Sequence, residues 1–223
     1  AHYLRHVLRL AVGDAVALFN GRDGEWRARI DGFAKAGGAL TVAEQTRPQI
    51  VEPDLWLVFA PIKRARIDFV AEKATELGVS ALWPVITQHT AMTRVNIERL
   101  RANAVEAAEQ TERLSVPTVF APAKLADLIV RWPTGRRLLV CAEAGPARPI
   151  AEALADIAAD EAARCCGWAV LVGPEGGFAA SELRRERQGG AVAYHGEPAS
   201  GGFGPGSRLY FYAEREAGSL EYS

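Results

Sequence analysis

The chain has 223 residues, of which 49% are hydrophobic and 24% are charged, a composition typical of a globular protein of one or two domains with a buried core. Its 26 basic and 27 acidic residues leave a net charge of -1, which excludes the strongly positive overall field of many nucleic-acid-binding proteins. No apolar run approaches the length of a membrane span and no signal peptide is apparent, so we expect a cytoplasmic protein without a membrane partner.

Residues 1–50 have the alternating apolar and polar side chains of β structure. In the stretch DAVALFNGRDGEWRARIDGF, turn signals at Asn20-Gly21 and Asp23-Gly24 predict a hairpin. The segment GGALTVAEQ predicts one more strand, and together these elements favour a small barrel preceded by the basic segment HYLRHVLRL. Because the chain starts in the middle of this pattern, we expect its natural N-terminus to be truncated.

A stretch with two prolines at 46–54 predicts a linker, and the pattern changes after it. Helices are predicted at 64–78, at 96–113 and from Pro149 onward, and each follows an apolar run short enough for a strand covered on both faces. This alternation favours an α/β fold with a mostly parallel sheet. The predicted strands are residues 55–60, 81–86, 116–120, 137–143 and 168–172.

The last predicted strand runs into the stretch LVGPEGGFAASEL, residues 171–183, which has glycines, a proline and a carboxylate at the strand's end. In open α/β sheets, ligands bind at the carboxyl ends of strands, and glycines there allow the backbone to approach a ligand closely. The loop has neither the GxGxxG spacing nor the Lys-Ser or Lys-Thr of a phosphate-binding loop. Taken alone, it fits a ligand site and a tight turn equally well.

Four motifs in one order give the chain a strong resemblance to the RsmE family between about residues 2 and 188: LRHVLRL, RIDFVAEKATELGVSALWPV, AVEAAEQTERLSVPTV and LVGPEGGF. Members of this family use S-adenosylmethionine to methylate the N3 position of a uridine in small-subunit (16S) ribosomal RNA. The resemblance implies a PUA-like β-barrel that binds RNA, here residues 1–50. It also implies a SPOUT methyltransferase domain, here residues 54–223, with a parallel sheet, a trefoil knot and a homodimeric assembly.

The resemblance also implies which residues bind the cofactor. The loop after the last predicted strand would form one wall of the adenosylmethionine pocket, because its backbone amides and carbonyls can bond adenine and ribose without bulky side chains. For Glu175 three arrangements stay open: a bond to a ribose hydroxyl, a bond within the loop, and a solvated carboxylate. The expected lining residues are Leu171, Gly173, Glu175, Gly176 and Gly177.

Three arginines are the expected contacts to substrate RNA. Arg5 and Arg9 are four residues apart and face one way if their segment is helical, although a solvated face is the alternative interpretation. Arg113 matches the first arginine of the family's EQxxRxxVP motif, whereas Ser115 replaces the second arginine and His89 stands where many members have arginine.

Methyl transfer from a sulfonium is a direct displacement, so the protein mainly positions the two reactants. The uridine N3 is protonated at neutral pH and needs a base or a charge stabiliser, but the sequence identifies no catalytic residue. Glu76, Glu109 and Gln110 match family positions and are expected near the pocket or the dimer interface in structural hydrogen bonds. The 3 cysteines and 4 histidines have no metal-ligand spacing, so we predict no metal.

The chain departs from the family in residues 190–223, where members carry the segment that closes the knot and forms the second wall of the pocket. Seven of the eighteen residues from 189 to 206 are glycine, a composition that buries little apolar surface. A local reading-frame disruption is one hypothesis, and a genuine tail with a diverged pocket is the other.

Three functions follow from these observations. The first is S-adenosylmethionine-dependent methylation of a ribosomal uridine. The second is a catalytically impaired RNA-binding relative that has lost part of the cofactor pocket. The third is an α/β enzyme that binds nucleotide phosphates in its glycine loop, which the absent phosphate motifs disfavour.

Overall fold

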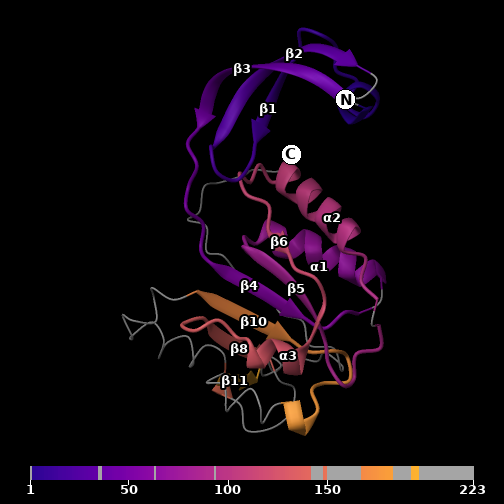
Figure 1. Cartoon of the computed structure of the whole chain (residues 1–223), viewed down its shortest axis with the longest axis vertical. Helices are drawn as coiled ribbons and strands as arrows, with labels where there is room; N and C mark the ends of the chain where they lie inside the picture. Colours follow the sequence, from indigo (N-terminus) through magenta and orange to yellow (C-terminus); the bar gives the residue numbers. More distant parts are fainter. Residues whose placement is uncertain are drawn as a thin grey trace, which may run out of the picture.

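The computed structural model describes residues 2–34, 37–62, 64–92, 94–141, 148–149, 167–182 and 192–195. Within them, two separate sheets lie at opposite ends of an elongated molecule (Figure 1). We call the three strands nearer the N-terminus the N-terminal sheet and the other strands the large sheet.

The N-terminal sheet is antiparallel, with strand order β1-β2-β3, and a short π-helical turn precedes it. The predicted hairpin is confirmed: the Asn20 side chain accepts hydrogen bonds from the backbone amides of Arg22 and Asp23, and Gly21 and Gly24 both have left-handed backbone conformations. The elements are η1 (Tyr3–Val7), β1 (Ala15–Phe19), β2 (Glu25–Ala34) and β3 (Gly37–Arg47).

The large sheet is parallel throughout its described strands, as the alternating pattern predicts. Its order is β6-β5-β4-β10-β8-β11-β9, and β7 pairs with β5 beyond the end of β6. The order places β10, a late strand, between β4 and β8 at the centre of the sheet. The strands are β4 (Leu55–Phe59), β5 (Ala81–Ile86), β6 (Thr118–Val119), β7 (Ala123–Lys124), β8 (Arg137–Cys141), β9 (Arg148–Pro149), β10 (Trp168–Val172) and β11 (Val192–His195).

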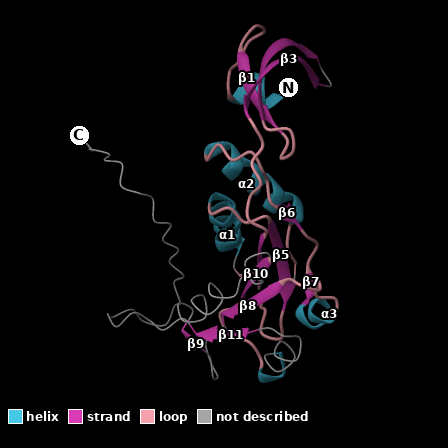
Figure 2. Ribbon diagram, turned by 90° about the vertical axis from the view of Figure 1, so that its left-hand side faces the viewer, coloured by secondary structure: helices cyan, strands magenta, loops and turns pink. Residues whose placement is uncertain are grey.

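Helices cover both faces of the large sheet, with α1 (Arg64–Glu76) and α2 (Ile97–Gln110) on one side and α3 (Leu125–Val130) on the other (Figure 2). Neighbouring strand residues therefore enter different apolar clusters, as Val58 packs in the α3-side cluster and Phe59 in the α1-side cluster. This two-sided burial explains the continuous apolar runs of the strands.

Local signals set the ends of the two longer helices. Asn96 caps α2 by accepting a hydrogen bond of 3.0 Å from the backbone amide of Arg99. Gly78, with φ of +94°, takes the left-handed conformation that ends α1. Of the helices in the described ranges, none combines the length and apolar character that crossing a membrane requires.

Some elements differ from the sequence-based expectations. The predicted strand at 116–120 forms only two ladder residues, and the helix predicted over 64–78 ends at Glu76, which leaves Leu77 54% exposed. The short elements α3, β7, β9 and β11 have no counterpart in the expectations. The helix expected to open at Pro149 falls on 150–166, outside the described residues. In the segment expected to diverge from residue 190, β11 pairs in parallel with β8 and β9.

Candidate functional site

The glycine loop, residues 173–177, leaves the large sheet at its centre. Near the end of β10, the strand before this loop, Leu171 is fully buried in the α3-side cluster. It is in register with Val58 of β4 and Val140 of β8. The backbone amide of Ala60 donates to the carbonyl of Val172 at 2.9 Å, so β4 and β10 end together. Since the strands are parallel, the loops after β4, β5 and β10 all emerge at the same edge of the sheet.

Packing and backbone conformation account for two of the three glycines in this loop. A Cβ on Gly173 would lie 2.7 Å from the ring of Phe178, so the aromatic ring occupies the space a side chain needs. Gly177 has φ of +68° and donates its amide to the carbonyl of Pro174 at 2.9 Å, which closes a tight turn. Gly176 is different, because among the described residues its Cβ would approach only His89, at 3.5 Å. The packing of the described residues therefore does not require glycine at position 176.

His89, in the loop after β5, binds the glycine loop directly. Its Nδ1 atom lies 3.2 Å from the carbonyl oxygens of both Gly176 and Gly177. Since carbonyl oxygens only accept, Nδ1 carries the proton and donates. The sequence marks His89 as a departure from the family's arginine, but its contact with a loop 87 residues further along the chain emerges only from the fold.

Glu175 forms an ion pair with Arg66 in the first turn of α1, with 2.7 Å between Arg66 Nη1 and Glu175 Oε1. This ion pair is not among the arrangements that the sequence left open, although the Glu175 side chain is largely exposed, as in the solvated alternative. The side chains are 65% and 57% exposed, so water screens the pair and its contribution to stability is small.

Glu182 closes the far end of the loop. Its carboxylate accepts a hydrogen bond of 2.9 Å from the amide of Ala179, and so caps the helical turn at 180–182. The other carboxylate oxygen accepts from the amide of Gln88 at 2.9 Å, which ties this turn to the loop after β5. Side chains from three segments thus hold the backbone from Glu175 to Ala179.

The two N-terminal arginines lie in the part of the molecule that carries the N-terminal sheet, far from the turn at 180–182 (Figure 1). Arg5 is exposed in η1, which ends at Val7. Arg9 is also exposed but has φ of +56°, so it lies outside any helix. The condition for a shared helical face is therefore not met, and their contact with RNA stays a prediction.

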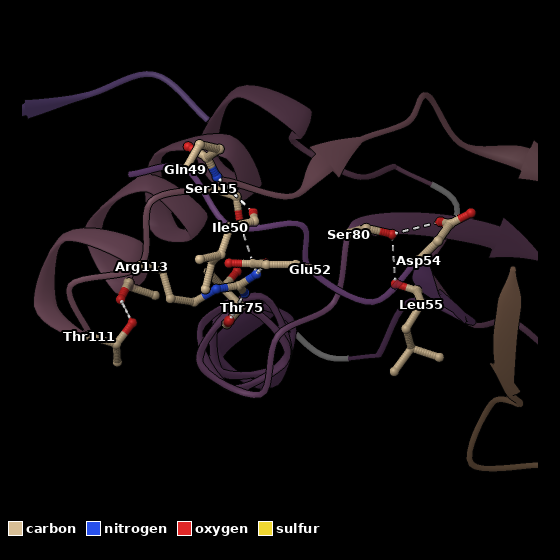
Figure 3. A network of polar contacts seen from close by, with 11 residues as sticks. Gln49, Ile50, Glu52, Asp54, Leu55, Thr75, Ser80, Thr111, Arg113 and Ser115 are labelled. Carbon is tan, nitrogen blue, oxygen red and sulfur yellow. Dashed lines mark hydrogen bonds and ion pairs between the residues drawn. The ribbon is translucent and has the colours of Figure 1, made fainter. Parts of the chain in front are cut away.

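Arg113 lies in a different place again, between the linker and the end of α1, as Figure 3 shows. Its side chain is 11% exposed and donates to Glu52, to the carbonyl of Thr75 and, at 3.1 Å, to the hydroxyl of Ser115. All three groups belong to the protein, and they lie near the amino-end edge of the large sheet, where β4 begins. The expected contact between Arg113 and RNA stays a prediction that this geometry does not favour.

The other polar residues singled out from the sequence also lie toward the amino-end edge of the large sheet. Glu76 is at the end of α1 and pairs with Lys73 at 2.9 Å. Glu109 and Gln110 are exposed at the end of α2. Across the residues that the structure describes, no group of three or more His, Cys, Asp or Glu side chains could hold a metal ion.

Comparison with known proteins gives consistent matches. Residues 51–195 match the family model described as "RNA methyltransferase domain", and residues 1–32 match the one described as "RNA methyltransferase PUA domain". The first match extends through β11, beyond the start of the segment expected to diverge. The chain is 33% identical over 187 residues to ribosomal RNA small subunit methyltransferase E of Rickettsia conorii, covering 82% of this chain and 72% of that relative.

Solved structures share the fold. A probable rRNA-methyltransferase from Porphyromonas gingivalis superposes with a TM-score of 0.74 and 22% identity, over 89% of this chain and 83% of that one. The ribosomal RNA small subunit methyltransferase E from Neisseria gonorrhoeae, solved bound to S-adenosyl methionine, superposes with a TM-score of 0.72 and 22% identity, over 88% and 80% of the two chains.

Proposed function

Since the chain belongs to the RsmE family of ribosomal RNA small-subunit methyltransferases, we propose that it methylates the N3 position of a uridine in 16S ribosomal RNA with S-adenosylmethionine as methyl donor. The observation that carries the proposal is the glycine loop at the carboxyl end of β10, which is bound by Arg66 of α1, by His89 of the loop after β5 and by Glu182 of the turn that follows it.

The loop fits an adenosylmethionine site on its own geometry. A Cβ on Gly176 would be in ordinary contact with His89, 3.5 Å away, and with no other described residue, so little of the described protein covers the backbone here. The hydrogen bond that His89 donates and the one that Glu182 accepts hold the loop in place before the cofactor arrives. This reduces the entropy lost on binding. When bound, S-adenosylmethionine supplies a methyl group carried on a positively charged sulfonium.

Within this proposal, Gly173, Glu175, Gly176 and Gly177 form one wall of the cofactor site. Leu171 lies in β10 just before that wall, and its side chain is fully buried in the core beneath the loop. Arg66 holds Glu175 at the side of the loop. These residues bind and orient the donor.

The N-terminal sheet carries the proposed RNA contacts. Arg5 and Arg9 are exposed, as residues that bind phosphates must be. A uridine within structured RNA has to be turned out of its stack before its N3 can reach the methyl donor, and its N3 proton has to be removed. We assign no base for that proton within the described residues.

The remaining features of the proposal follow from the family resemblance. They are a trefoil knot in the methyltransferase domain of residues 54–223, a homodimeric assembly and a cytoplasmic location. A second candidate function is a catalytically impaired RNA-binding relative, favoured by the glycine-rich composition of residues 189–206, where members close the cofactor site.

Calorimetric titration of the purified chain with S-adenosylmethionine tests the proposal first. We expect a dissociation constant of about 1 μM, equal to a binding free energy of about -8 kcal/mol. We then expect the chain to transfer a labelled methyl group to the 16S RNA of small subunits that lack this modification. Mass spectrometry of the digested RNA identifies 3-methyluridine. A folded chain that binds RNA but neither the cofactor nor the label would support the impaired relative instead.

A further inference from the structure

The linker between the two sheets, residues 48–54, is bound at two points by arginines of the methyltransferase part. Glu52 pairs with Arg113, and Asp54 pairs with Arg136, which precedes β8. The two arginine side chains are only 11% and 10% exposed. A linker held in this way has little freedom, although its two prolines and its position between sheets suggest a flexible connection.

The pair of Arg113 and Glu52 is the more enclosed of the two, since Glu52 is 18% exposed and Asp54 is 55% exposed. Arg113 also donates to the carbonyl of Thr75 at the end of α1 and to Ser115. A guanidinium that donates to three groups at once offsets the free energy lost when its charge is removed from water. Removal of either partner of the ion pair leaves the other charge buried without its counterpart.

The residues next to Arg113 also contact the N-terminal sheet. Arg47, the last residue of β3, donates to the carbonyl of Glu112 at 2.9 Å and to the carboxylate of Glu25 at 2.5 Å. In the turn between β1 and β2, a Cβ on Gly21 would lie 3.7 Å from the carbonyl oxygen of Leu114. The turn at 112–115 therefore touches the end of β3, the β1–β2 turn and, through Arg113, the linker.

We propose that Arg113 is a positioning residue, which through Glu52 and the turn at 112–115 fixes the orientation of the N-terminal sheet relative to the glycine loop. This inference rests on the proposed function, because the orientation matters only if RNA held by the N-terminal sheet must present a uridine to that loop. A fixed orientation gives the target base a high effective concentration at the methyl donor, and a freely moving sheet does not. Arg113 itself then makes no contact with RNA.

Kinetics of Arg113→Ala and Glu52→Gln, each in the full chain, test the proposal. We expect both variants to raise KM for RNA about tenfold or to lower kcat by a similar factor, because either change releases the linker. The dissociation constant for S-adenosylmethionine should stay within about twofold of the unchanged chain, which also shows that the variants fold. The double variant should be no worse than either single one, since both act on one contact.

The salt dependence of RNA binding separates positioning from phosphate contact. Loss of one phosphate contact lowers the slope of log affinity against log salt by about 0.7 to 0.9, and Arg5→Ala and Arg9→Ala are expected to do so. Arg113→Ala should leave the slope unchanged. Arg101→Gln is the matched control for lost charge, because Arg101 is 53% exposed and pairs only with Glu98 among described carboxylates.

Two results would overturn the proposal. One is a reduced salt slope in Arg113→Ala together with normal RNA kinetics in Glu52→Gln, which would make Arg113 an RNA contact. The other is normal kinetics in both variants. If the unchanged chain methylates no RNA, the proposed function fails separately. Hydrogen exchange of the linker amides still tests the contact between Arg113 and Glu52. Arg113→Ala must speed exchange at 49–54, and unchanged exchange would contradict the role of that contact.

Discussion

The Nδ1 atom of His89 lies 3.2 Å from the carbonyl oxygen of Gly176, so the loop after β5 is bonded to the glycine loop after β10. These strands are not neighbours, because β4 lies between them. The contact therefore spans the carboxyl edge of the sheet and holds the glycine loop from the side.

Substitution of His89 should weaken cofactor binding without unfolding the protein. His89→Ala removes one donor to two carbonyls, and loss of about 1 kcal/mol of loop stabilisation corresponds to about a fivefold higher Kd for S-adenosylmethionine. His89→Asn is the matched control, because its amide can donate from a position close to that of Nδ1. Calorimetry of both variants makes the comparison, and an equal loss in the two would argue against the hydrogen bond as the cause.

Alanine at Gly173 should mainly destabilise the fold, whereas alanine at Gly176 should mainly weaken cofactor binding. A Cβ at Gly173 lies 2.7 Å from the ring of Phe178, so Gly173→Ala forces repacking that costs about 1–3 kcal/mol and lowers Tm by several degrees. Gly176→Ala meets only His89 at 3.5 Å, and we expect Tm to change by less than about 2 °C.

The same Gly176→Ala variant should bind S-adenosylmethionine at least about tenfold more weakly, because the new methyl group occupies the side of the backbone that the ligand approaches. Thermal unfolding and calorimetry on one preparation of each variant separate the two effects. Unchanged affinity in Gly176→Ala would show that the cofactor does not approach this face of the loop.

Acid should weaken the second anchor of the linker. The hydrogen bond from Arg136, and after it the one from Ser80, hold the pKa of Asp54 below its ordinary value of 3.8. A carboxylate with a lowered pKa in the folded state stabilises the fold above pH 3.8, and this contribution disappears as pH falls through the folded pKa. Asp54→Asn should therefore lower Tm at pH 7 and lower it less near pH 2.

Thermal unfolding followed by circular dichroism at both pH values measures this difference. Glu98→Gln serves as the control, because Glu98 is 81% exposed and its pair with Arg101 is screened by water. A loss of Tm in Asp54→Asn that is the same at pH 7 and near pH 2 would assign the effect to packing instead of charge.

Cys141 should be inert toward thiol reagents in the folded protein. Burial at the end of β8 raises the pKa of its thiol to about 11, compared with an ordinary value of 9.0, which lowers the reactive thiolate fraction at pH 8 by about a hundredfold. In a Cys165→Ser/Cys166→Ser background, which leaves Cys141 alone, labelling by iodoacetamide should be slow at pH 8 and rapid in denaturant. Rapid labelling of the folded chain would contradict the buried position.

The sequence by itself determined the elements whose signals are local. The strands β4, β5 and β10 are short apolar runs between turn signals, and the start of α2 is marked by a capping asparagine directly before an apolar period. The β1–β2 hairpin follows from its Asn-Gly and Asp-Gly turns in the same way. Each of these signals acts over only a few residues, so no knowledge of distant parts of the chain is needed to interpret them.

Short elements escaped prediction for the same reason. Helix α3 has six residues and β11 has four, too few for a period to show, and each forms because it packs on or pairs with the large sheet. Their stability comes from tertiary contacts that a local pattern does not contain.

Only the tertiary structure decided which side chains meet. The sequence predicts Arg113 as an RNA contact and gives His89 no partner, yet the strand order brings His89 to the glycine loop and the linker's path brings Glu52 to Arg113. The partners are 87 and 61 residues apart in the chain. The contact of His89 depends on β10 pairing beside β4, whereas the contact of Glu52 depends on the linker entering β4 beside the end of α1. Burial then bears on the role of Arg113, since a guanidinium with three protein partners and 11% exposure is held by the fold, as the proposed positioning role requires.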